Sequence, residues 1–384
     1  MKAIPYGRQD ITEADLAAVR EALLSDFLTQ GPRIAEFERA FASYIGCRHA
    51  VAVANGTVAL HLAALALGTK PGTRVITTPI TFVASANCVR YCGGDVYFAD
   101  IDPSTYLIDL AAVERLIQSK PKGYFHGIIA VDFAGRAVNL LELSRLAKEH
   151  GLWVLEDAAH SPGGWYAGEG DTKHRCGGCE HADAAIFSFH PVKHIACGEG
   201  GMITTNSDEV HQSLLLLRSH GITRDPAQLV YNHGGWYYEM QELGFNYRIT
   251  DFQAALGASQ LARADAGMAR RREIATRYAA AFSGNPRVLG QSGLIKGHAY
   301  HLYVIEVDER KSLYDFLRAN GVYSQVHYIP VHTMPYYRSL GSKLGDMPHS
   351  ERYYSRCLSL PMFPALTDSE QERVIDLVSQ WSRA

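Results

Sequence analysis

The feature that most constrains the fold is the regular alternation of strand-like and helix-like segments through the first half of the chain. The strand-like runs are short and apolar, and they lie at 49–54, 74–78, 96–101, 127–132 and 152–157. Segments with helical patterning separate them, and strands joined in this way form a mainly parallel sheet with right-handed crossovers. We therefore predict an α/β fold with a doubly wound sheet, in which ligands gather at the carboxyl ends of the strands.

The chain changes character near residue 250. A stretch rich in Ala and Arg, reaching about Phe282, predicts one long connecting helix, and a mixed α+β portion follows it. In that portion we expect strands at 300–307 and 322–328, and helices at 310–320, 350–357 and 367–382. A chain of 384 residues is long enough for two domains. We predict a large domain over 1–250 with the N-terminal segment, and a connector helix with a small domain over 251–384.

Composition and charge exclude several classes of protein. The formal net charge of −3 gives no general basic field for nucleic acid. No apolar run reaches membrane-spanning length, and the start lacks the apolar core of a signal peptide. The seven cysteines, an odd number without a scaffold spacing, fit reduced thiols. A cytoplasmic enzyme with no membrane or nucleic-acid partner is the expectation.

Lys193 lies in a turn between two strand-like runs, with Val192, Ile195 and Ala196 beside it. Partial desolvation lowers the pKa of a lysine and makes its neutral amine available for attack on an aldehyde. An ordinary surface lysine is the alternative for this stretch taken alone.

Asp157 stands at the carboxyl end of the strand-like run 152–157, where open α/β sheets place ligand-binding residues. An acid there suits the ring nitrogen of a pyridine. The cofactor that needs both a Schiff-base lysine and an acidic partner for its ring nitrogen is pyridoxal phosphate.

Two motifs carry a family resemblance. Residues 156–160 read E-D-A-A-H, and residues 188–201 contain S-F-H-x-x-K followed by G-E-G-G. The chain resembles the DegT/DnrJ/EryC1/StrS sugar aminotransferases, which are fold-type I pyridoxal-phosphate enzymes. The resemblance implies that Lys193 holds the cofactor and moves protons, that Asp157 pairs with its ring nitrogen, and that L-glutamate donates the amine.

The resemblance also assigns further cofactor contacts. The turn at Gly56 and Thr57 opens a helix whose amides form an anion site. The alternative is a plain strand-to-helix turn that binds no ligand. The family places an aromatic at Phe82 against the pyridine ring, where a core aromatic is the alternative. His160 would orient or pack on the ring and Ser188 would bind the phosphate. The G-x-N-[YF]-R segment implies that Asn246 reaches the phosphate of a neighbouring subunit, which requires a homodimer with shared active sites.

A narrower resemblance extends over nearly the whole chain. It is to the transaminases that make UDP-4-amino-4,6-dideoxy-N-acetyl-β-L-altrosamine in pseudaminic acid biosynthesis, whose ketosugar is UDP-2-acetamido-2,6-dideoxy-β-L-arabino-hex-4-ulose. The implied substrate contacts are Tyr6, Asp26, Phe27, Leu28, Thr29, Gly56, Ser188, Asn246, Gln325, Val326, His327, Tyr328 and Tyr337. Asp26-Phe27 and Asn55-Gly56 depart from the expected residues, which bears on the identity of the sugar more than on the reaction.

An insertion at 168–181 lengthens the segment between Asp157 and Lys193. Cys176 and Cys179 have C-x-x-C spacing, with His174 and His181 alongside, so a metal site is conceivable. The cluster lacks the second, distant ligand pair of most structural zinc motifs. We expect a surface excursion and no metal site.

Other functions remain open. The acceptor could be another UDP- or dTDP-linked ketosugar, of the perosamine or bacillosamine type. A dehydratase of the same family carries histidine in place of Lys193, and a pyridoxal-phosphate-binding regulator would need an added domain that is not visible. A nicotinamide enzyme would show a G-x-G-x-x-G turn after an early strand, and the chain lacks one.

Overall fold

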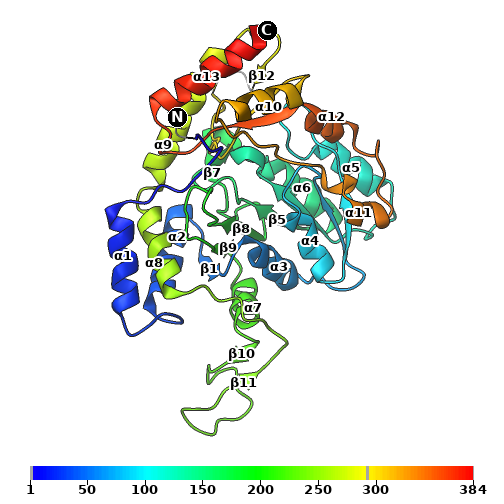
Figure 1. The fold of residues 1–384 in the computed structure, drawn as a ribbon. Coiled ribbons are helices and arrows are strands. Elements are labelled where there is room, and N and C mark those ends of the chain that lie inside the picture. Colours follow the sequence, from blue (N-terminus) through cyan, green and yellow to red (C-terminus); the bar gives the residue numbers. More distant parts are fainter. Residues whose placement is uncertain (1–2, 291–293, 384) are drawn as a thin grey trace.

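A seven-stranded sheet forms the centre of the protein (Figure 1). The computed structural model describes residues 3–290 and 294–383. In order across the sheet, the strands are β1 (His49–Val53), β9 (Gly201–Thr205), β8 (Ala184–Ser188), β5 (Trp153–Asp157), β4 (Gly127–Val131), β2 (Arg74–Thr77) and β3 (Asp95–Phe98). β9 runs antiparallel to both of its neighbours, and the other pairs are parallel. The prediction of a mainly parallel α/β sheet is confirmed.

Helices cover both faces of this sheet, because successive side chains of each buried strand point to opposite faces. In β4, Ile128 and Ala130 pack into one apolar cluster and Ile129 into another. The helices on the first face are α2 (Pro32–Ile45), α5 (Leu110–Gln118), α6 (Leu140–His150) and α8 (Asp251–Leu261). Those on the second face are α3 (Gly56–Ala66), α4 (Ala84–Tyr91) and α7 (Asp208–Arg218).

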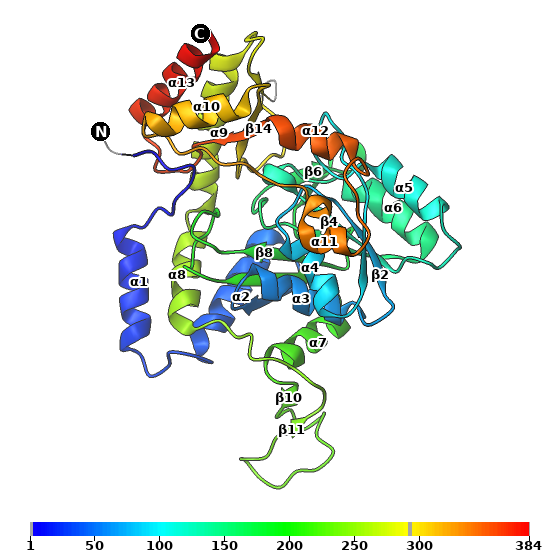
Figure 2. The same ribbon diagram turned by 45° about the vertical axis from the view of Figure 1, so that its right-hand side comes forward.

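A second, smaller unit is built from the C-terminal part of the chain (Figure 2). The elements that share its apolar core are α9 (Ala264–Phe282), α10 (Arg310–Ala319), α13 (Asp368–Arg383), β13 (Tyr303–Glu306) and β14 (Cys357–Leu360). The exposed strand β12 (Leu289–Gly290) pairs with β13 in antiparallel fashion.

One expectation for this unit is wrong. The segment 322–328 forms no strand, only isolated bridges of Val322 to Ile4 and of Gln325 to Ser359, because its two partners lie on different segments. The third strand is β14, which directly follows the helix α12 (Pro348–Arg356). Segment 322–328 is thereby left as a connection that leads toward the sheet.

The predicted connecting helix is two helices, α8 and α9, with a break at Ala262 and Arg263. Helix α1 (Glu13–Leu24) packs along α8 and starts at a capping box, in which the Thr12 N–H donates to Asp15 Oδ2 at 2.8 Å. Arg263 donates to Oδ2 of Asp10 and Oδ2 of Asp15, both at 2.9 Å. These contacts tie the break to the start of α1.

Contacts cross the predicted domain boundary at residue 250 in both directions. Ile4 is buried in the core of the smaller unit. Helix α8, which begins after the boundary, packs on α1 and α2. The division into 1–250 and 251–384 stays a prediction.

The insertion at 168–181 forms a hairpin of β6 (Trp165–Ala167) and β7 (Lys173–Arg175). The residues after β7 turn inward, so that Cys176 is 0% exposed and Cys179 7%. The expected surface excursion is therefore correct for the hairpin and wrong for the two cysteines.

A long excursion follows α7 and projects from the body of the molecule (Figures 1 and 2). We call residues 222–243 the finger. It has a short ladder of β10 (Ile222–Thr223) and β11 (Glu239–Met240). Its exposed apolar side chains are Val230, Tyr231, Trp236, Tyr238, Met240 and Leu243.

The helix α11 (Pro335–Ser339) packs near α4 and β3, where Tyr337, Phe98 and Ala86 share a small core. Among the described residues, each helix is too short or too polar to cross a membrane.

Candidate active site

The carboxyl ends of β5 and β8 meet at one edge of the sheet, because the two strands are parallel neighbours. Asp157 ends β5 and Ser188 ends β8. The chain then makes the loop 189–200, which carries Lys193, and returns through the antiparallel β9. The topology therefore brings the two motifs of the sequence to the same edge.

The carboxylate of Asp157 is buried and oriented by two donors. Ser85, in the first turn of α4, donates its hydroxyl to Oδ2 at 2.6 Å. The backbone N–H of Ala159 donates to Oδ1 at 3.2 Å. Burial raises the pKa of Asp157, while these hydrogen bonds and the charge of Lys193 act to lower it. A cationic ring nitrogen beside this carboxylate would keep it ionised.

Lys193 has an amine that is far more easily deprotonated than that of a free lysine. Burial lowers its pKa to about 7, with the charge of Asp157 opposing that shift and the charge of Arg271 adding to it. Near neutral pH a large fraction of the amine is neutral and nucleophilic. Lys193 is partly buried, and its role toward an aldehyde stays a prediction.

Arg271 was not predicted from the sequence as part of this region. It is fully buried on α9, and its Nη1 donates to the backbone oxygens of Tyr300, His301 and Met362 at 3.2, 3.1 and 3.0 Å. Burial lowers the pKa of Arg271 to about 10, so it stays cationic at neutral pH. It is a fixed positive charge near Lys193.

An anion cradle lies at the start of α3. Asn55 caps the helix by accepting a hydrogen bond from the Val58 N–H at 3.0 Å, and Gly56 and Thr57 form the first turn. A Cβ placed on Gly56 would lie 2.8 Å from Cβ of Ser188 and 3.1 Å from its Oγ. Free N–H groups of a first helical turn beside a hydroxyl form a phosphate site, and only glycine lets the two elements approach this closely.

Phe82 is a large aromatic ring that remains 58% exposed just before α4. Its ring centroid lies 6.3 Å from that of Tyr328. Because an exposed aromatic face near a buried acid and a desolvated lysine is suited to a flat apolar ring, Phe82 fits a stacking role.

His160 and the segment 325–328 close this region from the side of the smaller unit. The His160 ring is 5% exposed and lies within 3.2 Å of the Tyr328 hydroxyl through Nε2. His327 bonds through Nδ1 to the Ser359 hydroxyl at 2.8 Å, and its ring lies 5.3 Å from that of Tyr6. Four residues predicted to line the site therefore lie together: Tyr6, His160, His327 and Tyr328.

Other predicted contacts lie elsewhere in the chain. Residues 26–29 are exposed; Leu28 and Thr29 bond to Asp251 and Thr250 at the start of α8, and Phe27 bonds to the Ser25 hydroxyl. Asn246 is exposed at the base of the finger. Tyr337 is 3% exposed and donates its hydroxyl to Oδ1 of Asn87 at 2.8 Å. Their roles toward a substrate stay predictions.

The two cysteines of the insertion, Cys176 and Cys179, point to different surroundings rather than to one common site. Cys176 Sγ and carboxylate oxygens of Asp132 and Glu156 lie within 4.8 Å of one another. Burial raises the pKa of Glu156, whose Oε2 accepts from the Gly177 N–H at 2.8 Å. Cys179 Sγ lies instead 3.3 Å from the backbone oxygen of Thr204. The absence of a metal site stays a prediction.

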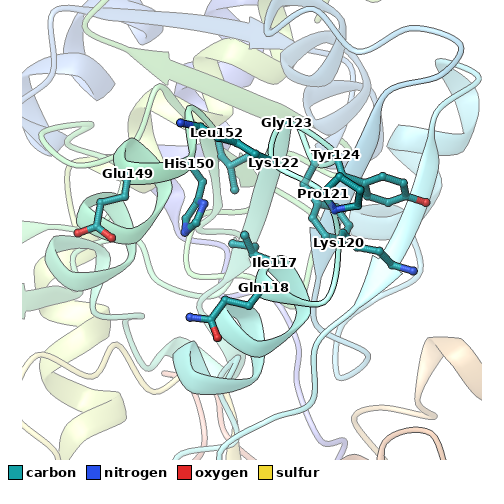
Figure 3. A pocket seen from close by; sticks show the side chains of 11 residues that line it. Ile117, Gln118, Lys120, Pro121, Lys122, Gly123, Tyr124, Glu149, His150 and Leu152 are labelled. Atoms are coloured by element: carbon teal, nitrogen blue, oxygen red, sulfur yellow. The ribbon is translucent and has the colours of Figure 1, made fainter.

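A separate hollow of about 260 Å³ lies near the amino ends of β4 and β5, and Figure 3 shows the side chains that line it. It is lined by side chains around the ends of α5 and α6, including Lys120, Tyr124 and His150. Leu152, which also lines it, precedes the amino end of β5. The hollow therefore lies at the opposite end of β5 from Asp157.

The residues at the carboxyl edge fit pyridoxal phosphate. The cradle at Gly56 and Ser188 suits the phosphate, Asp157 suits the ring nitrogen, and Phe82 and His160 offer ring faces. The desolvated amine of Lys193 suits the aldehyde.

Comparisons with known proteins extend over the whole chain. Residues 9–379 match the model of the DegT/DnrJ/EryC1/StrS aminotransferase family. The spore coat polysaccharide biosynthesis protein SpsC of Bacillus subtilis is 38% identical over 384 residues, covering 98% of this chain and 96% of its own.

Solved structures are similar over the same extent. PseC of Helicobacter pylori, an aminotransferase involved in pseudaminic acid biosynthesis, is 31% identical with a TM-score of 0.90, and all of both chains is covered. The candidate sugar aminotransferase Spr1654 of Streptococcus pneumoniae, in its PLP form, is 27% identical with a TM-score of 0.88 and 99% coverage of each chain.

Proposed function

The chain belongs to the DegT/DnrJ/EryC1/StrS aminotransferase family and is a fold-type I, pyridoxal-phosphate-dependent sugar aminotransferase, and from this premise we propose its substrates. The acceptor is UDP-2-acetamido-2,6-dideoxy-β-L-arabino-hex-4-ulose, the donor is L-glutamate, and the reaction belongs to pseudaminic acid biosynthesis. The observation that carries this proposal is the similarity to PseC over the full length of both chains.

The site residues support amino transfer. When bound, the cofactor supplies an aldehyde that accepts the amine and a ring that withdraws electrons from the carbon being deprotonated. Lys193 is the group that moves the proton at that carbon, because its pKa of about 7 leaves it able both to accept and to return a proton near neutral pH.

Asp157 keeps the ring nitrogen protonated. Its carboxylate is fixed by Ser85 and Ala159, so that it can face one fixed cation. Ser188, Gly56 and Thr57 would hold the phosphate, and Phe82 and His160 would hold the ring of the cofactor. In this arrangement the amine and the acid act at opposite ends of one ring.

A second acceptor is favoured by a specific observation. SpsC, 38% identical, is named for spore coat polysaccharide biosynthesis. A ketosugar of another polysaccharide precursor, linked to UDP or dTDP, is therefore the alternative substrate. The unexpected residues Asp26 and Phe27 are consistent with a changed sugar.

The proposal includes a homodimer with shared sites. Apolar side chains of the finger, such as Trp236 at 76% and Leu243 at 80% exposed, are suited to contact with a second copy. Asn246, exposed at the base of the finger, is positioned by the bridge to Ser219. In such a dimer, Asn246 would bind the cofactor phosphate in the partner subunit's site.

The test is a substrate panel. Purified protein is incubated with L-glutamate and UDP- or dTDP-linked 4-ketosugars, and the aminated product is identified by NMR, with K193A as the control. We expect the UDP-altrosamine product from the named ketosugar. Faster turnover of another ketosugar favours the alternative, and no amination of any member contradicts the proposed activity.

A further inference from the structure

We infer that His160 is a positioning residue that fixes the direction of the Tyr328 hydroxyl, so that this hydroxyl donates its hydrogen to a ligand oxygen in the site. The inference rests on the proposed function and deepens it. Two hydrogen bonds of His160 and the direction of each carry the inference: one is with the Ala134 N–H and the other with the Tyr328 hydroxyl. These directions leave the hydroxyl hydrogen of Tyr328 available to a ligand.

The first bond sets the tautomer of His160. The backbone N–H of Ala134 lies 3.2 Å from Nδ1 of His160. A backbone N–H can only donate, so Nδ1 must accept and carry no hydrogen. Burial lowers the pKa of His160 well below its usual value, with the charges of Lys193, His327 and His194 adding to the effect. The neutral ring therefore carries its one hydrogen on Nε2.

The backbone donor cannot turn away. Ala134 lies in a 3-10 turn, Phe133–Gly135, and has a φ of 60°. Its own carbonyl accepts from the Leu302 N–H at 3.1 Å, and the carbonyl of Gly135 accepts from the Ala299 N–H at 2.7 Å. These bonds hold the turn against the segment that precedes β13.

The second bond passes this direction to Tyr328. Nε2 of His160 lies 3.2 Å from the Tyr328 hydroxyl oxygen. Since Nε2 carries the hydrogen, the hydroxyl must accept, and its own hydrogen remains free. Within residues 3–290 and 294–383, His160 is the one side chain that hydrogen-bonds to this hydroxyl. The hydroxyl hydrogen is therefore available to an acceptor outside the chain.

The position of Tyr328 identifies that acceptor by its chemistry. Its ring lies 6.3 Å from the Phe82 ring and 6.0 Å from the Phe133 ring. Tyr328 lies beside the proposed place of the cofactor. Its free hydroxyl hydrogen needs an acceptor there, and an oxygen with a free lone pair meets that need. The phenolic oxygen attached to the pyridine ring of the cofactor and the keto oxygen of the sugar both meet this description.

If His160 only packed against its neighbours, the direction of its hydrogen bonds would not matter. The His160 ring also lies 4.3 Å from the His301 ring, a contact that another flat side chain could make. Phenylalanine at 160 would keep much of that packing and lose both hydrogen bonds. Glutamine would keep an acceptor toward Ala134 and a donor toward Tyr328.

The experiment begins with the protein free of sugar. In ¹⁵N NMR of histidine-labelled protein, we expect the His160 signals of a ring protonated on Nε2, and a hydrogen on Nδ1 would overturn the inference. H160F is expected to share the defect of Y328F, and H160Q to recover part of it. Equal defects in H160Q and H160F would contradict the directional role.

Y328F separates the two acceptors. If the acceptor is the cofactor oxygen, the absorption band of the bound cofactor shifts without sugar; if it is the keto oxygen, the band is unchanged and KM for the ketosugar rises about 10-fold. Y328F with neither effect overturns the inference. Conversion of glutamate by the wild-type enzyme in the absence of sugar tests the proposed function separately.

Discussion

The hydroxyl of Ser85 donates a 2.6 Å hydrogen bond to Oδ2 of Asp157, which links the first turn of α4 to the end of β5. A buried hydrogen bond to a charged group contributes about 1.5–3 kcal/mol, or roughly 10- to 100-fold in an equilibrium. We predict that S85A lowers kcat/KM about 10-fold with little change in fold. S119A, which removes an exposed hydroxyl at the end of α5, is the matched control and should leave kcat/KM unchanged.

The lowered pKa of Lys193 predicts the pH dependence of cofactor uptake by the apoprotein. The neutral amine reacts, and its fraction rises as pH increases through the pKa of about 7. We expect the uptake rate, followed by stopped-flow absorbance, to rise through pH 7 and level off well below the pKa of 10.5 of an ordinary lysine. In D157N the midpoint should fall, because the Asp157 charge raises the pKa of Lys193. A rate that keeps rising toward pH 10 contradicts the assignment.

Gly56 is predicted to be essential to phosphate binding. In G56A the new Cβ would lie 2.8 Å from Cβ of Ser188, so α3 and β8 must separate. We expect pyridoxal phosphate affinity, measured by fluorescence titration, to fall at least about 10-fold, which is about 1.4 kcal/mol. G267A is the control, because a Cβ at Gly267 on α9 meets only Pro364 Cγ, at an ordinary 3.6 Å. Equal affinities for the two variants would show that the close approach is not needed.

The finger is predicted to hold two subunits together. Trp236 is 76% exposed, and large aromatic anchors contribute about 2 kcal/mol or more at interfaces. W236S should raise the dimer dissociation constant about 30-fold in sedimentation equilibrium. L344S, which changes a 63% exposed side chain beyond the finger, should not.

Mixing two inactive variants tests the shared site. K193A and N246A each lack one proposed component, and a mixed dimer contains one site with both. We expect activity to return on mixing and subunit exchange. If the mixture stays inactive while mixed dimers form, Asn246 does not serve the partner's site.

The positions of Asp157 and Lys193 at one end of the sheet could be predicted because each is encoded locally. Asp157 ends an apolar strand and Lys193 follows another, and parallel neighbours in a sheet bring their carboxyl ends to one edge. The helices between the strands, among them α5 and α6, were likewise expected from the helical patterning of those segments. Such features depend on short-range patterns.

Residues that act through distant partners could not be found in this way. Ser85 is 72 residues from Asp157, and Arg271 reaches backbone oxygens up to 91 residues away. Segment 322–328 has strand-like composition, but a strand also needs a partner along its length, and its bridges go to two different segments. Cys176 is buried in an apolar cluster beside Asp132 and Glu156, and the spacing of the cysteines does not reveal this environment.

The central claim is that the amine of Lys193 and the carboxylate of Asp157 serve one pyridoxal phosphate. The most direct measurement is borohydride reduction of the isolated enzyme, followed by proteolysis and mass spectrometry. We predict a reduced pyridoxyl group on the peptide that contains Lys193, absent from K193A. A label on another lysine, or no label on the cofactor-loaded enzyme, would contradict the account.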